Sequence, residues 1–326
     1  MTIKEWSNHP VLIPRLEALI LTKINSVLVL GAGAMGAAYA SRFYEMNPGI
    51  VSFVASGERF QRLKADGLVV NNQHYAIPVL SPEYDSPPAD LIIVALKHHH
   101  LKTALQDIKK RVGDKTIFLS IMNGLDSEPM IGSVYGDEKV VYATALGIDA
   151  QRDGNIINYS KGGTIFFGEA ENKGLSDRVK SIQDLFESAG IDYQTPADMI
   201  RILWWKFMIN VGINQPSAVL SAPYGVFQTS PHAQRIMESA MREALLVAQA
   251  SRVNLSEEDI QEWYPVLNTL DPEGKTSMLQ DIEAGRKTEV DIFAGKVIEL
   301  GNTFNLATPV NEFLFHAIKA LEQNRT

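Results

Sequence analysis

The pattern of apolar positions changes near residue 195 and divides the chain in two. In the first half, short apolar runs alternate with stretches of helical periodicity, which is typical of parallel strands buried on both faces. The expected strands are 27–30, 50–55, 68–70, 75–80, 90–96, 116–121, 140–146, 156–159, 164–167 and 192–194. The second half is helical almost throughout, with expected helices at 232–252, 257–267, 277–284, 289–302 and 311–323.

This pattern predicts an α/β fold class. A Rossmann dinucleotide-binding domain over 24–194 would be followed by an all-α domain over 195–326. Residues 1–23 are interpreted as an N-terminal extension, helical around 14–22, to which the residues assign no chemistry. At 326 residues, the chain is long enough for two domains.

A glycine-rich turn follows the first expected strand. Its sequence is G-x-G-x-x-G, and a helix is expected directly after it. In this context the first glycine allows a tight turn, the second lets the backbone approach a pyrophosphate, and the third lets the helix pack on the strand. The helix N-terminus then faces the phosphates. The sequence therefore predicts that a dinucleotide binds at Gly31, Ala32, Gly33, Ala34, Met35 and Gly36.

The end of the second expected strand bears on the choice of cofactor. NAD-binding folds place an acid there to hold the ribose hydroxyls, whereas this chain has Ser56 followed by Arg59 and Arg62. Arginines at this place favour a 2′-phosphate, so we expect NADP (NADPH) as the cofactor and NAD as the less favoured alternative. In the other interpretation the two arginines lie on a solvated helical face, and Glu58 beside them supports it.

Polar residues end two further strands. Lys97 follows the strand 90–96, and Asn123 with Gly124 follows 116–121. Because ligands bind beyond the carboxyl ends of parallel strands, we expect both side chains near the cofactor or substrate. The alternative for the Asn-Gly pair is a plain turn. The three histidines 98–100 are adjacent and would point in different directions, so we expect no metal site.

The segment 195–216 predicts a helix that is apolar nearly all round. Thr195 and Asp198 form a T-x-x-D capping box at its start. Its polar exceptions, Lys206, Asn210 and Asn214, are spaced four residues apart and therefore share one face. Either this stripe extends to the surface and satisfies a neighbouring loop, or it lines an active-site cleft.

Two later segments hold further candidates. Ser277 starts the S-M-L-Q-D segment, and Glu289 lies in T-E-V-D. Ser277 could serve only as a helix N-cap, and Glu289 only as a favourable acid in a first turn.

Composition excludes several classes of function. With 38 acidic and 30 basic residues the formal net charge is −8, which argues against a nucleic-acid or anionic-membrane partner. The absence of cysteine excludes disulfides, thiolate metal sites and a cysteine nucleophile. There is no apolar run of transmembrane length and no signal-peptide cleavage pattern at the start, so we expect a cytoplasmic protein.

Taken in order, these motifs resemble the ketopantoate reductase (2-dehydropantoate 2-reductase) family over residues 24–321. The motifs are GAGAMG, Lys97, Asn123-Gly124, W-x-K-x3-N-x3-N, SMLQD, TEVD and ATPVNE. The resemblance implies NADPH-dependent reduction of ketopantoate to pantoate in pantothenate and coenzyme A biosynthesis, at a site between a Rossmann domain and a helical domain.

The resemblance also assigns roles. It implies that Lys206 and Glu289 are catalytic and that Lys97 lies at the cofactor side of the cleft. We expect Lys206 to protonate the ketone oxygen as hydride reaches C2, with a pKa lowered by burial and raised again by Glu289. The substrate-binding positions that it implies are Asn123, Asn210, Asn214 and Ser277, and Asn123 is also expected beside the cofactor.

Three departures keep other functions open. The family usually has arginine where this chain has Ser56, some members have a substrate-contacting asparagine where it has Tyr224, and Gly274 likewise replaces an asparagine. The alternatives are a related NAD(P)-dependent reductase of another small 2-oxo or 3-hydroxy acid, or a non-catalytic NADP(H)-binding sensor. The expected partner is a small-molecule 2-oxo acid, and a homodimer is the assembly to test.

Overall fold

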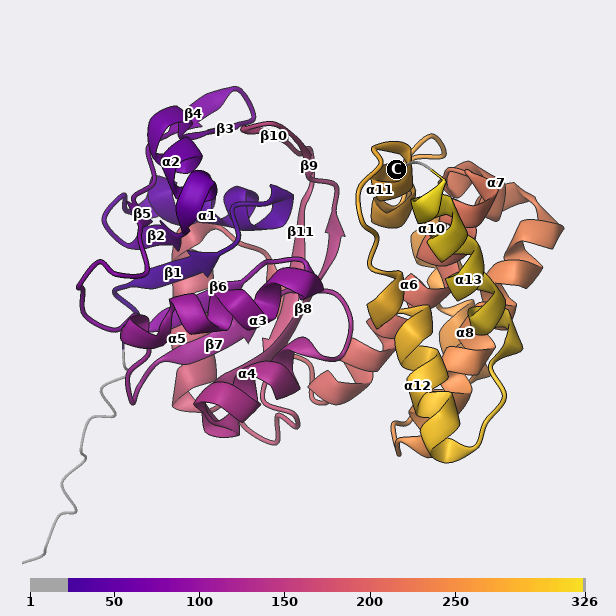
Figure 1. Ribbon diagram of the computed structural model, residues 1–326. Helices are drawn as coiled ribbons and strands as arrows, with labels where there is room; N and C mark the ends of the chain where they lie inside the picture. The colour runs from indigo at the N-terminus through magenta and orange to yellow at the C-terminus, as the bar shows by residue number, and fades with distance from the viewer. Residues whose placement is uncertain (1–22, 325–326) are drawn as a thin grey trace, which may run out of the picture.

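The computed structural model describes residues 23–324, in which a sheet-containing part lies beside an all-helical part (Figure 1). The helix expected at 14–22 lies outside the described residues. The last strand of the first part ends at Gln194 and the first helix of the second begins at Met199. The α/β fold class with a helical C-terminal part is confirmed.

An eight-stranded sheet forms the centre of the first part, in the order β12-β11-β8-β7-β6-β1-β2-β5. Its strands are parallel except for the antiparallel pair β8 and β11. The strand bounds are β1 Val27–Leu30, β2 Val51–Val54, β5 Val79–Leu80, β6 Leu91–Val94, β7 Ile117–Ser120, β8 Val140–Ile148, β11 Gly162–Gly168 and β12 Tyr193–Gln194.

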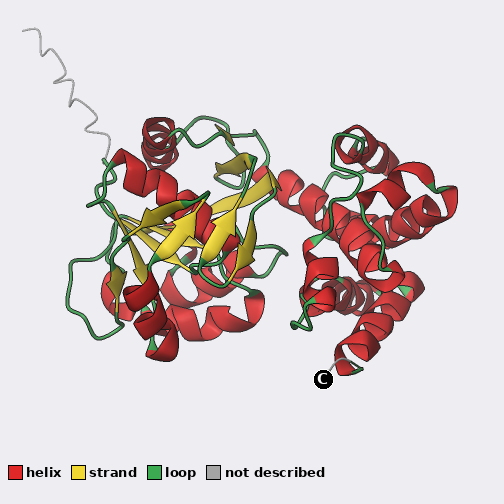
Figure 2. Cartoon of the chain, turned by 90° about the horizontal axis from the view of Figure 1, so that it is seen from above, coloured by secondary structure: helices red, strands yellow, loops and turns green. Residues whose placement is uncertain are grey.

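Helices cover both faces of this sheet, as the view from above shows (Figure 2). Along β1, Val27 and Val29 belong to one buried cluster, while Leu28 and Leu30 belong to a second. A strand buried on both faces explains why its apolar run is unbroken. The helices are α1 Ala34–Met46, α2 Gly57–Asp66, α3 His98–Asp107, α4 Ser127–Tyr135 and α5 Asp177–Ala189, with short 3-10 turns η1 Lys109–Arg111 and η2 Asp137–Lys139.

A smaller, four-stranded sheet lies beside α2, in the order β4-β3-β10-β9. Its strands are β3 Leu68–Val70, β4 Gln73–Tyr75, β9 Gln151–Asp153 and β10 Ile156–Asn158. The single strand expected over 75–80 is wrong, because β4 ends at Tyr75 and β5 joins the large sheet. Pro78 separates them and has no N–H to offer a ladder, although its carbonyl accepts a hydrogen bond from Phe53 N at 2.8 Å.

The helical part is built around α6, Met199–Leu220, which packs against α8, α11 and α13 and reaches back to β8 and β11. The other elements are α7 Tyr224–Thr229, α8 Pro231–Ala250, α9 Glu257–Gln261, α10 Trp263–Leu267, α11 Ser277–Glu283, η3 Val290–Ile292, α12 Ala294–Phe304 and α13 Pro309–Gln323. Together they enclose a third buried cluster. Among residues 23–324, no helix has the length and apolar character needed to cross a membrane.

The bounds of α6 differ from those expected. Asp198, not Thr195, is its N-cap, and its carboxylate accepts a hydrogen bond from Arg201 N at 2.8 Å. The helix also continues through Pro216 to Leu220. Proline usually ends a helix, but burial of this segment among the surrounding helices outweighs that preference.

Candidate functional site

The glycine turn between β1 and α1 is shaped for a close backbone approach. A Cβ on Gly31, whose φ is +108°, would lie 2.3 Å from Ala95 O, and a Cβ on Gly36 would lie 1.9 Å from Gly31 O. A Cβ on Gly33 would meet only Ala95 O, at 4.0 Å, so the backbone there is open. No side chain caps α1 and no acid lies in its first turn. Free amides at an open helix N-terminus fit a pyrophosphate.

The end of β2 carries no acid. Ser56 is exposed, and its hydroxyl donates a hydrogen bond to Asp107 Oδ2 at 3.3 Å. Arg59 and Arg62, on the following helix α2, are exposed and form no ion pair with any residue that the structure describes. The exposure of both arginines agrees with the alternative of a solvated helical face.

Arg152, on β9, reaches the glycine turn from the small sheet. Its Nη1 donates to Ala32 O at 2.5 Å and its Nε donates to Gly154 O at 2.7 Å. The sequence analysis missed this residue. No local pattern could have found it, because the contact with Ala32 spans 120 residues and depends on how the small sheet folds back.

Lys97 joins the two parts of the molecule. Lys97 Nζ donates to Asp281 Oδ2, on α11, at 2.5 Å, while Arg286 Nε donates to the other carboxylate oxygen at 2.9 Å. Asp281 was not predicted as a site residue, although it lies four residues after Ser277. The contact places Lys97 at the interface between the two parts, just after the carboxyl end of β6.

Asn123 forms two side-chain hydrogen bonds across the same interface. Its Nδ2 donates to Glu289 Oε2 at 3.1 Å, and its Oδ1 accepts from Asn210 Nδ2 at 3.3 Å. Gly124 has a φ of +91°, and a Cβ there would lie 3.1 Å from Ile292 Cδ1. The Asn-Gly pair is thus both a turn and a contact with the helical part, so the plain-turn alternative is incomplete.

Burial lowers the pKa of Lys206 and raises the pKa of Glu289. Lys206 is half-buried, forms no hydrogen bond or ion pair with a described residue, and has a pKa lowered to about 8 by burial. Burial also raises the pKa of Glu289, and the hydrogen bond from Asn123 and the charge of Lys97 oppose that rise. The expected lowering of the Lys206 pKa by burial is thus the direction found, and the opposing effect of Glu289 stays a prediction.

The polar stripe of α6 meets the sheet part at Asn210. Asn210 is 5% exposed and contacts Asn123, and residues four apart share a helical face, so Lys206 and Asn214 lie on the same side. Asn214 is buried, at 6% exposure. The contact of Asn210 with the loop at Asn123 agrees with both interpretations of the stripe, so the active-site role of the stripe stays a prediction.

Ser277 is the exposed first residue of α11. The N-cap is Thr276, whose Oγ1 accepts a hydrogen bond from Leu279 N at 3.2 Å, so the interpretation of Ser277 as the cap is wrong. Ser277 lies one turn before Asp281, on the face of α11 that meets Lys97. Its hydroxyl has no hydrogen-bond partner among residues 23–324.

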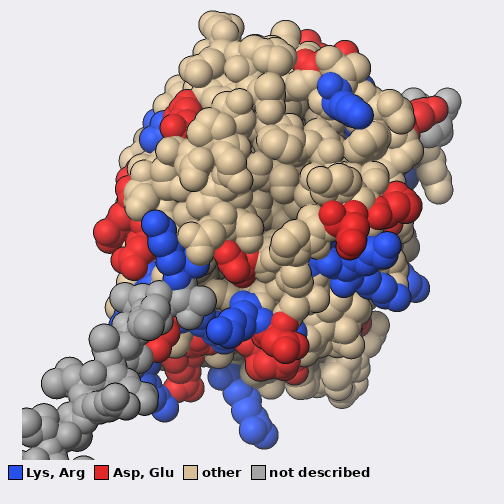
Figure 3. All heavy atoms as spheres, turned by 90° about the vertical axis from the view of Figure 1, so that its left-hand side faces the viewer, with Lys and Arg blue, Asp and Glu red and all other residues tan. Residues whose placement is uncertain are grey.

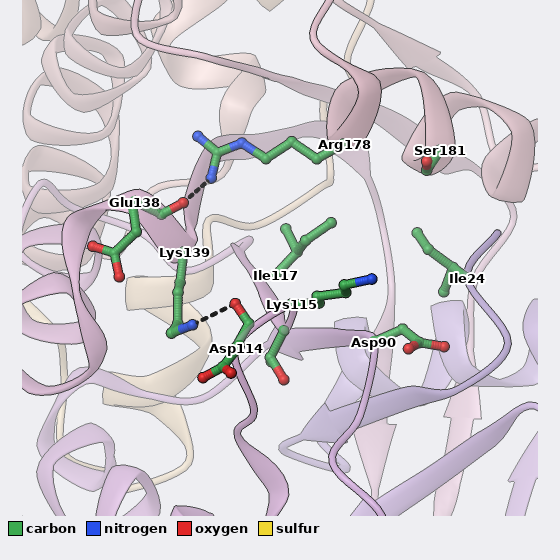
Figure 4. Close-up of a pocket in the computed structure, with 10 residues that line it drawn as sticks. Ile24, Asp90, Asp114, Lys115, Ile117, Glu138, Lys139, Arg178 and Ser181 are labelled. Carbon is green, nitrogen blue, oxygen red and sulfur yellow. Dashed lines mark hydrogen bonds between the residues drawn. The ribbon is translucent and has the colours of Figure 1, made fainter. Parts of the chain in front are cut away.

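A separate pocket of about 300 Å³ lies at the opposite edge of the large sheet (Figure 4). Asp90, Ile117 and Lys139 line it near the amino ends of β6, β7 and β8, and Lys139 Nζ donates to Asp114 O at 2.7 Å. Since the glycine turn follows the carboxyl end of β1, this pocket is remote from the interface between the two parts.

On the outer face of the sheet part, positive and negative side chains are interspersed (Figure 3).

Comparison with known protein families identifies the family of this chain. The model described as ketopantoate reductase PanE/ApbA matches residues 27–172, and the model of the C terminal of the same family matches 198–322. The chain belongs to the ketopantoate reductase family. It is thus an oxidoreductase with a Rossmann-like first part, as the sequence predicts.

Relatives of this ketopantoate reductase family member span nearly its whole length. A 2-dehydropantoate 2-reductase of Aquifex aeolicus is 25% identical over 303 residues, covering 90% of this chain and 96% of the relative. A D-mandelate dehydrogenase solved with NADH and anilino(oxo)acetate superposes with a TM-score of 0.84 at 22% identity, covering 92% and 99%. A dimeric ketopantoate reductase of Staphylococcus aureus gives 0.78 at 21%, covering 92% and 100%. These two structures support the fold alone.

Proposed function

We propose that this protein uses NADPH to reduce the C2 ketone of ketopantoate, giving pantoate for pantothenate and coenzyme A biosynthesis. The observation that carries the proposal is the half-buried, unpaired Lys206 on the helix face whose Asn210 meets Asn123 across the crevice. An unpaired ammonium in such a place suits a carbonyl oxygen that gains negative charge.

The first part would hold the cofactor. The turn from Gly31 to Gly36 and the first turn of α1 offer backbone amides to its pyrophosphate. Ser56 and Arg59 would lie at the ribose end, and Lys97 and Asn123 at the crevice end. When bound, NADPH supplies a hydride.

The helical part would hold and protonate the substrate. Lys206 stabilises the developing alkoxide and then donates a proton to it from Nζ. Asn210, Asn214 and Ser277 offer neutral hydrogen-bond partners to a small polar acid. Glu289, with its raised pKa, orients the Asn123 amide and would accept a hydrogen bond from a substrate hydroxyl.

A second candidate is the reduction of a different 2-oxo acid. The ring of Tyr224 lies beside Gly274, where a Cβ would be 3.1 Å from Tyr224 Cδ2. An aromatic ring has replaced two amides at this point, which favours a substrate with a larger apolar substituent.

Steady-state oxidation of NADPH and NADH with ketopantoate and a panel of 2-oxo acids tests the proposal. We expect the highest kcat/KM with ketopantoate and NADPH. A clear preference for an apolar 2-oxo acid would favour the second candidate, and binding of NADPH without turnover of any acid would indicate a sensor. Light scattering of the purified protein tests the proposed homodimer.

A further inference from the structure

Arg152 is held against the glycine turn by two hydrogen bonds to backbone carbonyls. Nη1 donates to Ala32 O at 2.5 Å and Nε donates to Gly154 O at 2.7 Å. Nη2 of Arg152 forms no hydrogen bond with any residue that the structure describes. A half-buried arginine with a fixed plane is a preorganised anion ligand.

The small sheet places this arginine beside α2. β10 pairs in parallel with β3, the strand that directly follows α2, and β9 pairs with β10. Asn155, in the turn between β9 and β10, has its Nδ2 3.4 Å from Asp66 O at the end of α2. The small sheet therefore contacts the glycine turn through Arg152 and the C-terminal end of α2, the helix that carries Arg59 and Arg62, through Asn155.

The three arginines form a positive cluster. Burial and the nearby charges of Arg62 and Arg59 together lower the pKa of Arg152. None of the three pairs with a carboxylate in residues 23–324, although acids outnumber bases in this chain. Like charges held together without a counterion destabilise a fold, so their persistence points to an anionic ligand.

The pyrophosphate already has a partner in the open amides at Gly33 and the start of α1. The ribose of a dinucleotide is placed at the end of β2, which directly precedes α2, the helix of Arg59 and Arg62. Guanidinium groups bind phosphate by two parallel hydrogen bonds. Here the arginine that the family resemblance expects at Ser56 is missing, and a guanidinium from another sheet lies within the same region.

We propose that Arg152, with Arg59 and Arg62, binds the 2′-phosphate of NADPH, and that Arg152 is the main determinant of preference for NADPH over NADH. This inference rests on the proposed NADPH-dependent function. Arg152 is held in place by a hydrogen bond to the glycine turn, whereas the two arginines of α2 are exposed to solvent.

The test is calorimetric binding of 2′,5′-ADP and of 5′-ADP, which differ by this phosphate, to the wild type, Arg152→Gln, Arg152→Lys and the double variant Arg59→Gln/Arg62→Gln. Arg235→Gln is the matched control, since Arg235 is exposed on α8 in the helical part. We expect Arg152→Gln to weaken 2′,5′-ADP binding about 10- to 100-fold and to leave 5′-ADP within about twofold. Arg152→Lys should retain part of the affinity, and Arg59→Gln/Arg62→Gln should lose less than Arg152→Gln.

Retained 5′-ADP binding in Arg152→Gln shows that the glycine turn has kept its shape. Equal weakening of both nucleotides would overturn the proposal, because Arg152 would then only support the turn. Equal affinity of the wild type for the two nucleotides would overturn it as well. In that case ketopantoate-dependent oxidation of NADH would still uphold the reductase function.

Discussion

The side-chain amide of Asn123 donates a hydrogen bond to Glu289 Oε2 at 3.1 Å, joining a loop of the sheet part to the helical part. Its oxygen accepts from Asn210 at the same time, so both ends of the amide are engaged and its orientation is fixed. Glu289 has a raised pKa because it is buried. This contact explains why an amide, and not a carboxylate, occupies position 123.

Asn123→Asp should therefore place two carboxyl groups about 3 Å apart, which disfavours the ionisation of both. We expect kcat/KM for ketopantoate to fall about tenfold or more, with a larger loss as the pH rises and the second carboxyl ionises. Steady-state kinetics from pH 6 to pH 9 measure this. Asn302→Asp, at an exposed position of α12, is the control, and equal losses in both variants would contradict the argument.

Lys206→Ala should reduce turnover by about 100-fold or more and leave NADPH affinity within a few-fold, because it removes the proton donor but no cofactor contact. Turnover is measured under saturating conditions, and affinity by the quenching of tryptophan fluorescence. Lys102→Ala, on the exposed side of α3, should behave as the wild type. Turnover of the Lys206 variant near the wild-type rate would remove this residue from the mechanism.

The pKa of about 8 for Lys206 predicts a pH dependence of the reduction. Burial lowers this pKa below that of the unfolded chain, so the folded enzyme loses the ammonium as the pH rises through about 8. The neutral amine cannot donate the proton, and kcat/KM should fall about tenfold for each further pH unit. An arginine at position 206 stays charged in this pH range. The kcat/KM of Lys206→Arg should therefore show no fall above about pH 8, whatever its absolute value. A wild-type profile that stays flat to pH 10 would contradict the assignment.

Glu128 predicts a different effect of pH, on stability. Its carboxylate accepts a hydrogen bond from Ser127 Oγ at 2.8 Å, and burial raises its pKa to about 7. Between the unfolded pKa of 4.5 and this value, the folded state binds more protons than the unfolded state, so stability decreases as the pH rises. From pH 5.5 to pH 8 the free energy of unfolding should lose about 2 kcal/mol through this group.

Urea denaturation at both pH values measures that loss. Glu128→Gln should remove most of it, while Glu273→Gln, at an exposed site, should retain it. An unchanged pH dependence in Glu128→Gln would show that this carboxyl is ionised in the folded protein at both pH values.

Gly274→Asn should destabilise the protein by about 1–3 kcal/mol. A Cβ at this position would lie 3.1 Å from Tyr224 Cδ2 and 2.9 Å from Asp271 O. In a Tyr224→Asn background the first obstacle is absent, so the loss should be smaller by at least about 0.5 kcal/mol. A double-mutant cycle by urea denaturation measures this coupling. Strictly additive losses of stability would show that the two positions do not interact.

Local patterns were sufficient for the features that depend on neighbours in the chain. The unbroken apolar runs predicted the central strands, the glycine spacing predicted the turn before α1, and the four-residue spacing of Lys206 and Asn210 predicted their shared face. The predicted helix N-caps were wrong where two nearby residues were equally suited to cap the helix. Thr195 and Asp198 are both good caps, and Thr276 and Ser277 are adjacent hydroxyl residues, so only the folded backbone decides which one caps.

Long-range contacts could not be predicted in this way. Asp281 meets Lys97 across 184 residues, and Arg152 meets Ala32 across 120. Each pairing depends on how separate units pack against each other, and a single sequence carries no periodic signal for such packing.

The bridge from Asn210 through Asn123 to Glu289 has one more consequence, which concerns movement. Its members belong to two bodies of the molecule, so any opening wide enough to admit a substrate also pulls the amide away from its partners. A movement that separates the sheet part from the helical part would therefore break both hydrogen bonds together and release the amide of Asn123 from its fixed orientation.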